Sequence, residues 1–302
     1  MSEFRAGLML MLGANMLWGL MPVFWKLFDG VDSAEVLAHR TVWSLVFTAF
    51  LLSFSHGFQQ VWQRLRDAKQ FALLLFSSIL IGANWLAYIW AVNTGQVVAS
   101  SMGYFLAPLL SVCCGVIFFR ERLRLWQWIA VAIAAMGVCV QFIVFGEVPW
   151  VGLFLAGTFA AYGAVRKKSS CDSTSGLAAE TLLLTPLAIA YMLWLEAESR
   201  AQFMHVSLSL DAFFVLAGLV TALPLVLFVA ASKRLPLSTV GLMFYLTPTL
   251  QFLLGLLAYN ETITLGEWLG FVLIWMALVI FTLDGRRAER ALPSAPMHQS
   301  QV

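Results

Sequence analysis

The chain has 302 residues, of which 61% are hydrophobic and only 11% are Asp, Glu, Lys or Arg. A soluble domain carries about 25% charged residues, so a chain this apolar cannot cover its surface with polar groups. The net charge of +2 and the lack of a basic domain argue against nucleic acid as a partner. The composition therefore predicts an integral membrane protein whose main surroundings are the lipid bilayer.

Apolar segments recur along the chain between short polar connectors. A helix needs about 20 apolar residues to cross about 30 Å of hydrocarbon. On this basis we predict an all-α integral membrane fold of ten transmembrane helices, at residues 6–28, 34–54, 71–93, 97–119, 125–145, 150–165, 177–195, 212–232, 237–258 and 265–283. The first segment is longer than the apolar core of a signal peptide and lacks a cleavage-site pattern, so it is interpreted as the first span.

The charges between these segments predict the orientation, because cytoplasmic connectors carry an excess of Lys and Arg. With a cytoplasmic N-terminus, one side of the membrane receives Arg5, Arg64, Arg66, Lys69, Arg120, Arg122, Arg124, Arg166, Lys167, Lys168, Lys233, Arg234, Arg286, Arg287 and Arg290. The loops of the opposite side keep only Arg200, beside several acidic residues. Both termini are therefore predicted to be cytoplasmic, and residues 284–302 are expected to be a disordered tail.

The two halves of the chain resemble each other at a fixed offset of 140 residues. Pro108 then matches Pro248, and Glu121 matches Glu261. We therefore predict two five-helix repeats, residues 6–145 and 150–283. Because five is odd, the second repeat enters the membrane from the opposite side. Inverted repeats of this kind place a substrate site near the midplane, at the repeat interface, and support alternating access.

Several segments together resemble a known family. They are LWGLMPVFWK (17–26), HRTVWS (39–44), GANWLAYIWAVN (82–93), GYFLAP (103–108), FFRERLRLWQW (118–128), YGAVRKK (162–168) and YLTPT (245–249). On these residues the chain resembles the EamA-type branch of the drug/metabolite transporter superfamily, over residues 6–283. The resemblance implies a permease of the cell inner membrane that moves a small molecule.

Ionisable groups within membrane spans are costly and so mark candidate functional positions. Lys26, His39 and Arg40 lie toward the outer ends of the first two spans, where they would favour an anionic solute. Alternatively, Lys26 extends to the headgroup region and His39 is a packed polar residue. Glu180, with His39, is the candidate for proton coupling, although Glu180 is also close enough in sequence to pair with Arg166, Lys167 or Lys168.

Aromatic and amide side chains in the third span predict a binding wall. Asn84, Trp85 and Tyr88 fall on neighbouring faces of one helix, and such side chains suit an organic solute. Interhelical packing is the alternative. Two further candidates, Tyr104 and Tyr245, come shortly before Pro108 and Pro248, which are predicted to break helices and free carbonyl groups.

The function predicted from these features is secondary transport of a small metabolite or drug-like solute, with proton exchange as the energy source to test first. A channel or structural scaffold is the alternative. Of the four His only His39 lies in a predicted span, and the four Cys lack metal-ligand spacing, so neither an enzyme nor a metal or other cofactor is expected. The solute and the oligomeric state are left open.

Overall fold

The computed structural model describes residues 3–28, 30–54, 57–93, 97–146, 150–258 and 265–291. This part of the chain contains helices and no β-strand. The helices are α1 (Glu3–Trp25), η1 (Lys26–Phe28), α2 (Ser33–Ser53), α3 (Gly57–Arg66), α4 (Ala68–Asn93), α5 (Val97–Phe119), α6 (Leu125–Phe145), α7 (Trp150–Lys168), α8 (Ser173–Ala197), α9 (Leu208–Arg234), α10 (Leu237–Phe244), α11 (Leu246–Ala258) and α12 (Leu265–Ala291).

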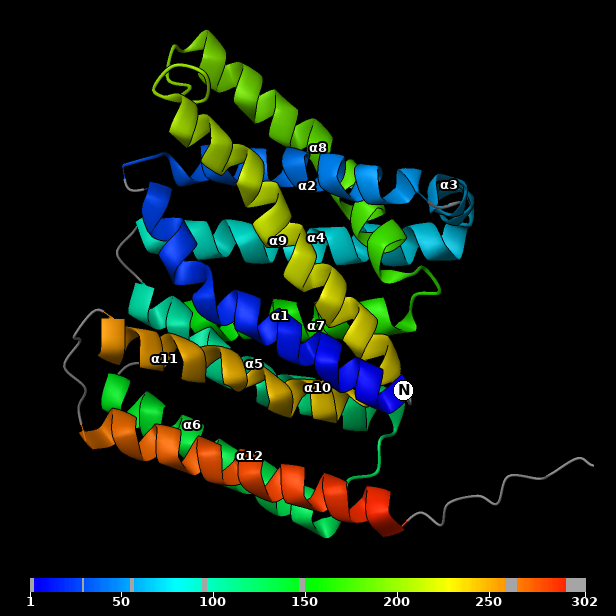
Figure 1. Ribbon diagram of the computed structural model, residues 1–302, viewed down its shortest axis with the longest axis vertical. Helices are drawn as coiled ribbons and strands as arrows, with labels where there is room; N and C mark the ends of the chain where they lie inside the picture. Colours follow the sequence, from blue (N-terminus) through cyan, green and yellow to red (C-terminus); the bar gives the residue numbers. More distant parts are fainter. Residues whose placement is uncertain are drawn as a thin grey trace, which may run out of the picture.

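Most of these helices lie side by side in one bundle (Figure 1). α6 and α12 pack against each other along one edge, and α2, α4, α8 and α9 lie toward the opposite edge. α1, α5, α7, α10 and α11 lie between these groups. The start of α1 and the end of α12 are on the same side of the bundle. The fold is thus all-helical, as expected for a membrane protein.

Within the described residues, seven helices are long and apolar enough to cross a membrane, fewer than the ten spans predicted. One reason is that the predicted segment 237–258 is divided at Tyr245 into α10 and α11, each too short to cross alone. Pro248 lies in the first turn of α11 and has no N–H to donate to the preceding turn, which explains the division. Another reason is that α7 ends in three basic residues, which lower its hydropathy.

Two helical segments extend beyond the prediction. α3, between α2 and α4, has no continuous apolar run and so was not predicted as a separate element. α12 continues to Ala291, which corrects the prediction of a tail that is disordered from residue 284. Asp284 forms an ion pair with Arg124 at 2.6 Å, and the Arg, Ala and Glu residues that follow are good helix formers. Residues 292–302 lie outside the described residues.

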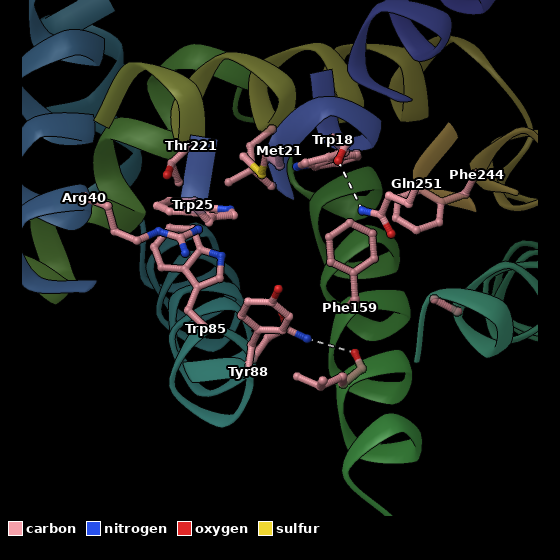
Figure 2. A pocket seen from close by; sticks show the side chains of 14 residues that line it. Trp18, Met21, Trp25, Arg40, Trp85, Tyr88, Phe159, Thr221, Phe244 and Gln251 are labelled. Carbon is pink, nitrogen blue, oxygen red and sulfur yellow. Dashed lines mark hydrogen bonds between the residues drawn. The ribbon is translucent and has the colours of Figure 1, made fainter. Parts of the chain in front are cut away.

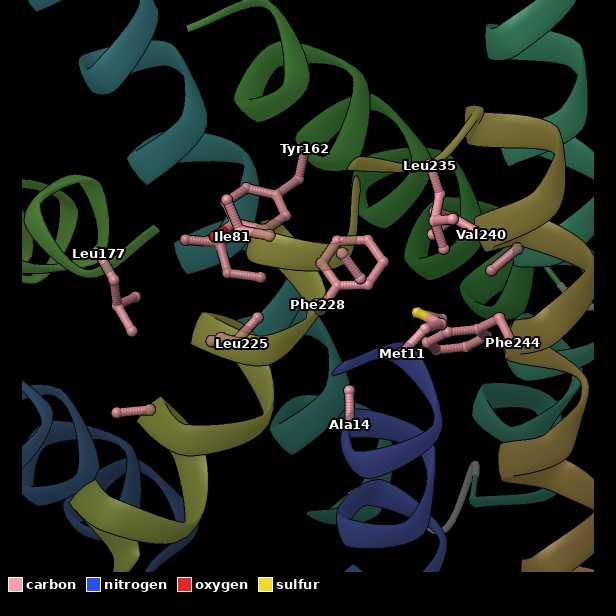
Figure 3. Packing of buried hydrophobic residues seen from close by; sticks show 14 of the residues in the cluster. Met11, Ala14, Ile81, Tyr162, Leu177, Leu225, Phe228, Leu235, Val240 and Phe244 are labelled. Carbon is pink, nitrogen blue, oxygen red and sulfur yellow. The ribbon is translucent and has the colours of Figure 1, made fainter. Parts of the chain in front are cut away.

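The largest buried cluster joins α1, α4, α7, α9 and α10 (Figure 3). Against this cluster the partly buried Trp18 ring contacts three phenylalanine rings, Phe159, Phe228 and Phe244, at centroid distances of 5.7, 5.6 and 5.4 Å. These four aromatic side chains come from four helices. Aromatic pairs at such distances add to the free energy gained from burial, so this cluster fixes the relative positions of helices far apart in sequence.

Small residues allow close helix crossings. A Cβ atom at Gly241 of α10 would lie 2.6 Å from the carbonyl oxygen of Pro108 in α5. Similarly, a Cβ atom at Gly137 of α6 would lie 2.9 Å from the carbonyl oxygen of Gly270 in α12. Close backbone approach through small residues is the usual way for helices to associate in lipid, where van der Waals packing replaces the hydrophobic effect.

Polar contacts tie the helix ends together on the side of the N-terminus. The Glu121 carboxylate accepts hydrogen bonds from the N–H groups of Leu237 and Ser238, at 2.6 and 2.9 Å, and thereby caps α10. Lys167 Nζ donates to the carbonyls of Ser232, at 3.0 Å, and Leu235. These contacts connect the α5–α6 turn and the end of α7 to the α9–α10 turn.

The turn between α7 and α8 is tied to α9 in the same way. Lys233 Nζ donates to the carbonyl of Ser169 at 3.0 Å and to that of Cys171. Cys171 is buried in this turn, and burial raises the pKa of its thiol, so the side chain remains neutral. On the side of the bundle that carries the N-terminus, partly buried lysines therefore join the helix ends through main-chain carbonyl groups.

Candidate functional site

A cavity of about 110 Å³ lies where α1, α4, α7 and α9 approach the junction of α10 and α11 (Figure 2). Its wall is rich in aromatic rings, with a few polar groups among them. The lining residues are Trp18, Met21, Trp25, Arg40, Asn84, Trp85, Tyr88, Ala107, Leu155, Phe159, Thr221, Leu225, Phe244 and Gln251. Four side chains predicted from the sequence, Arg40, Asn84, Trp85 and Tyr88, thus meet in one cavity to which both halves of the chain contribute.

Arg40 brings a positive charge to this aromatic wall. Its guanidinium carbon lies 4.5 Å from the centre of the Trp85 ring and 5.2 Å from that of Trp25, and Figure 2 shows the guanidinium beside both rings. The residue is only 8% exposed. A cation over an indole face is attracted by the ring quadrupole, and the attraction is stronger when the cation is desolvated. The two indoles therefore hold a permanently charged group at the cavity wall.

The other polar groups of the wall differ in how many hydrogen bonds they already form within the protein. The Asn84 amide donates to the Leu155 carbonyl at 2.8 Å and to the Thr158 hydroxyl at 2.9 Å, so it holds α4 against α7. The Gln251 amide donates to the Trp18 carbonyl at 3.3 Å. The buried hydroxyl of Thr221 has no hydrogen-bond partner within the described residues, which leaves it available to a solute.

Two predicted residues are buried away from the cavity wall. The His39 ring lies between Phe203 and Phe214, with both ring centroids at 4.5 Å. Tyr245 packs in the cluster formed by α5, α6 and α12, and its hydroxyl has no hydrogen-bond partner in the described part of the chain. Both positions agree better with packing roles than with direct solute contact.

The predicted helix-breaking prolines behave differently from each other. α5 continues through Pro108, whereas the division between α10 and α11 at Tyr245 lies just before Pro248. The side chains of Lys26 and Tyr104, both predicted to bind solute, lie outside the described residues.

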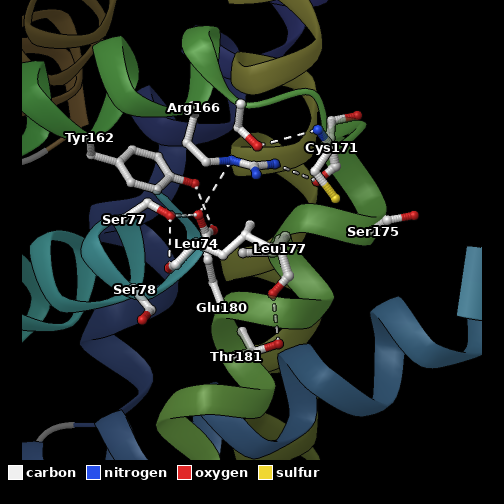
Figure 4. Close-up of polar contacts among 12 residues, drawn as sticks. Leu74, Ser77, Ser78, Tyr162, Arg166, Cys171, Ser175, Leu177, Glu180 and Thr181 are labelled. Atoms are coloured by element: carbon white, nitrogen blue, oxygen red, sulfur yellow. Dashed lines mark hydrogen bonds and ion pairs between the residues drawn. The ribbon is translucent and has the colours of Figure 1, made fainter. Parts of the chain in front are cut away.

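Glu180 lies in a buried polar cluster at the start of α8 (Figure 4). Its carboxylate is 3.3 Å from Arg166 Nε, and both side chains are 0% exposed. It also accepts hydrogen bonds from the Ser77 hydroxyl and, at 3.2 Å, from the Tyr162 hydroxyl. Arg166 in turn donates to the carbonyl of Asp172 at 3.1 Å. Of the three basic residues expected near Glu180, Arg166 is the one that forms the buried pair.

Arg40 and Glu180, which occupy matched positions in the two predicted repeats, have different surroundings. Arg40 lies between indole rings at the cavity wall, whereas Glu180 is bound by Arg166, Ser77 and Tyr162. Glu35, on the same helix as Arg40, accepts hydrogen bonds from the N–H groups of Gln202 and Phe203, at 2.7 and 3.1 Å. That carboxylate therefore holds the loop between α8 and α9.

A family model for EamA-like transporters matches residues 5–143 and again residues 149–283. The chain belongs to the EamA-like transporter family. It is 41% identical over 289 residues to an uncharacterized transporter of Vibrio cholerae, with 96% of each chain covered. It is also similar to proteins named RarD, at 41% identity in Salmonella typhimurium and 39% in Escherichia coli, with 95% of this chain covered and 98% and 97% of theirs.

A solved crystal structure resembles this family member in fold, with a TM-score of 0.70 over 94% of this chain and 99% of the other. At 18% identity this likeness concerns the fold alone. Together, the family and its transporter relatives identify the chain as a membrane transporter. Within the described residues, no group of three or more His, Cys, Asp or Glu side chains is arranged to hold a metal ion.

The sequence also held signals for cavity residues that were not predicted. Trp18, Met21 and Trp25 are spaced i, i+3 and i+7, which places them on one face of α1. A face with two Trp and one Met in a span interrupted by Pro22 could have been singled out. By contrast, Phe159, Phe244 and Thr221 are ordinary span residues, and only the packing of helices shows that they meet.

The buried ion pair gives a first prediction. Arg166→Leu and Glu180→Leu should each destabilise the folded protein by about 3–5 kcal/mol, because each leaves an uncompensated buried charge. The double variant should be more stable than either single variant. Thermal unfolding of the purified proteins in detergent would measure this.

The exposed ion pair between Arg234 and Glu3, with side chains 37% and 82% exposed, provides a matched control. The equivalent changes there should cost less than about 1 kcal/mol. A double variant at positions 166 and 180 that is as unstable as the sum of its singles would contradict a stabilising pair.

Proposed function

We propose that this chain is a secondary transporter that moves a small organic solute with an anionic group through the described cavity by alternating access. The observation that carries the proposal is Arg40, held between Trp25 and Trp85 at the wall of an aromatic cavity. A buried cation that cannot be deprotonated is expensive inside a membrane and so marks a functional position.

The contacts between helices support two inverted repeats of five spans, residues 6–145 and 150–283. If the two repeats are related by a two-fold axis, each helix has a counterpart: α1 and α7, α2 and α8, α4 and α9, α5 and the pair α10–α11, and α6 and α12. Each contact between helices should then have a counterpart contact. The contacts α2–α8, α5–α10 and α6–α12 are their own counterparts, the counterpart of α1–α9 is α7–α4, and that of α5–α7 is α11–α1. All of these pairs pack in the structure. The double match of the family model supports the same division.

The shape of the cavity supports a carrier more than a channel. About 110 Å³ is well below the 300–1,000 Å³ typical of pockets for drug-sized ligands, and a continuous water-filled pore would be larger. We infer that the helices move to admit and release a solute. In the proposed mechanism the two repeats rock against each other around the cavity, so that it opens to one side at a time.

The chemistry of the wall indicates the class of solute. Indole, phenol and phenyl faces suit an aromatic or otherwise flat apolar body, the guanidinium of Arg40 suits a carboxylate or phosphate, and the Thr221 hydroxyl offers a further hydrogen bond. Glu180 is the better candidate for proton coupling, since its partner Tyr162 comes one turn after the cavity residue Phe159. His39 is enclosed by two rings instead.

The proposed orientation, in the cell inner membrane with both termini in the cytoplasm, gives a second prediction. An alkaline phosphatase domain, which is active only outside the cytoplasm, should be inactive when fused after Ala291. The same domain inserted at Ser199, in the turn after α8, should be active. The reverse pattern of activities would exclude this orientation.

The charge of Arg40 gives a third prediction, tested by thermal shift of the purified protein with paired solutes that share an aromatic body and carry either a carboxylate or an ammonium group. The carboxylates should stabilise the wild type. Arg40→Gln should require about 10- to 100-fold more carboxylate for the same stabilisation, because a charge-assisted hydrogen bond of about 1.5–3 kcal/mol is lost. Arg40→Lys should be intermediate.

Arg200 provides the matched control, because its guanidinium also lies over an indole, that of Trp194 at 5.3 Å, but at the surface. Arg200→Gln should respond to carboxylates as the wild type does. Stabilisation by the ammonium solutes alone, or an unchanged response in Arg40→Gln, would refute the proposed solute class.

A further inference from the structure

α3 differs from the other helices in its direction. In Figure 1 it is seen nearly end-on, whereas its neighbours α2 and α4 run along the plane of the picture. It lies on the side of the bundle where α1 begins, and it connects the end of α2 to the start of α4. A helix that runs across the ends of membrane-spanning helices lies along the membrane surface.

One face of α3 packs on the bundle. Gly57 and Val61 are buried, and Val61 and Leu65 contact a cluster that includes Leu74 of α4 and Ala178 of α8. Gly57, Val61 and Leu65 follow each other at intervals of four residues, so they form a single stripe along the helix. This stripe fixes the helix to α2, α4 and α8.

A second stripe faces away from the protein. Phe58 and Trp62 are again four residues apart on α3 and are 53% and 58% exposed, and Phe54, which ends α2 just before this helix, is 75% exposed. Aromatic side chains at the level of lipid headgroups commonly anchor membrane proteins, with Trp especially favoured there. In a helix that lies along the membrane surface, this stripe suits contact with the acyl chains just below the headgroups.

Cations flank the aromatic stripe. Arg64 and Arg66 lie in the last turn of α3 and Lys69 lies at the start of α4, and the Arg66 guanidinium carbon is 4.9 Å from the Trp62 ring centre. In the described part of the chain no carboxylate forms an ion pair with these three side chains. The nearby Asp67 carboxylate instead accepts from the Gln70 N–H at 2.8 Å. Arg66 and Lys69 are exposed and Arg64 is half-buried, so positive charge is available at this end of α3.

We propose that the outer face of α3 binds an anionic phospholipid. The phosphate lies against Arg64, Arg66 and Lys69, and the acyl chains lie along Phe54, Phe58 and Trp62. A soluble anion would need only the cations, and a zwitterionic lipid would need only the aromatic stripe. The combination of both on α3 and the residues that flank it fits a lipid with net negative charge. The inference concerns the membrane and is independent of the transported solute.

Native mass spectrometry of the protein in detergent with equimolar phosphatidylglycerol and phosphatidylcholine tests this proposal. The wild type should retain phosphatidylglycerol in preference, by several-fold. The triple variant Arg64→Gln, Arg66→Gln, Lys69→Gln should lose that preference. Phe58→Ser with Trp62→Ser should reduce retention of both lipids while the charges remain. Millimolar glycerol phosphate should not displace the bound lipid.

A matched control removes three exposed charges elsewhere, Arg122→Gln, Lys168→Gln and Arg287→Gln, and should retain the preference. For the wild type alone, hydrogen–deuterium exchange of residues 57–66 should be slower in phosphatidylglycerol nanodiscs than in phosphatidylcholine nanodiscs, which tests the site without any variant. Equal loss in the control, an unchanged preference in the α3 triple variant, displacement by glycerol phosphate, or equal exchange in both nanodiscs would overturn the proposal.

Discussion

The ion pair between Arg166 and Glu180 joins the end of α7 to the start of α8, and the organisation of that side of the bundle depends on it. Both side chains are completely buried, so neither charge is solvated by water. The Coulomb attraction of such a pair offsets the desolvation cost only with good geometry and further hydrogen bonds. Ser77, Tyr162 and the Asp172 carbonyl provide those bonds. Four elements, α4, α7, α8 and their connecting turn, are thereby held in one arrangement.

Arg40 is stabilised in a different way against the cost of burying a charge away from water. Its guanidinium lies against two indole faces, which attract a cation without cancelling its charge. The first arrangement joins two helices through an ion pair, whereas the second places a guanidinium at the wall of a cavity. This difference between two buried arginines is the physical reason for assigning solute recognition to Arg40 and a coupling or structural role to the Glu180 cluster.

The connection between the two sites is short. Phe159 lines the cavity, and Tyr162, one turn later on α7, donates to Glu180. A movement of α7 at the cavity would therefore also move the Tyr162 hydroxyl relative to the carboxylate. Glu121, Lys167 and Lys233 join helix ends on the side of the bundle that carries the N-terminus. Under the proposed alternating access, these contacts are the ones to break when the cavity opens toward that side.

The sequence predicted the features that follow from hydropathy and from ionisable residues that are costly inside a membrane. Long apolar runs located most helices, and Arg40 and Glu180 were identified because ionisable residues are rare within membrane spans. It did not predict α3, because an interfacial helix has a periodic pattern but no long apolar run. Nor could it show that His39 would lie between two phenylalanine rings or that Glu180 would form its ion pair with Arg166 and not with Lys167. Those outcomes depend on how helices distant in sequence pack, which local pattern does not specify.

The most direct test of the account is counterflow in proteoliposomes. Vesicles that contain the purified protein are loaded with an unlabelled aromatic carboxylate that binds it, and then diluted into the same solute in radiolabelled form. A carrier with one alternately exposed cavity predicts a transient accumulation of label that saturates with concentration and is lost in Arg40→Gln. Label that only equilibrates, without saturation or overshoot and equally in Arg40→Gln, would contradict the account.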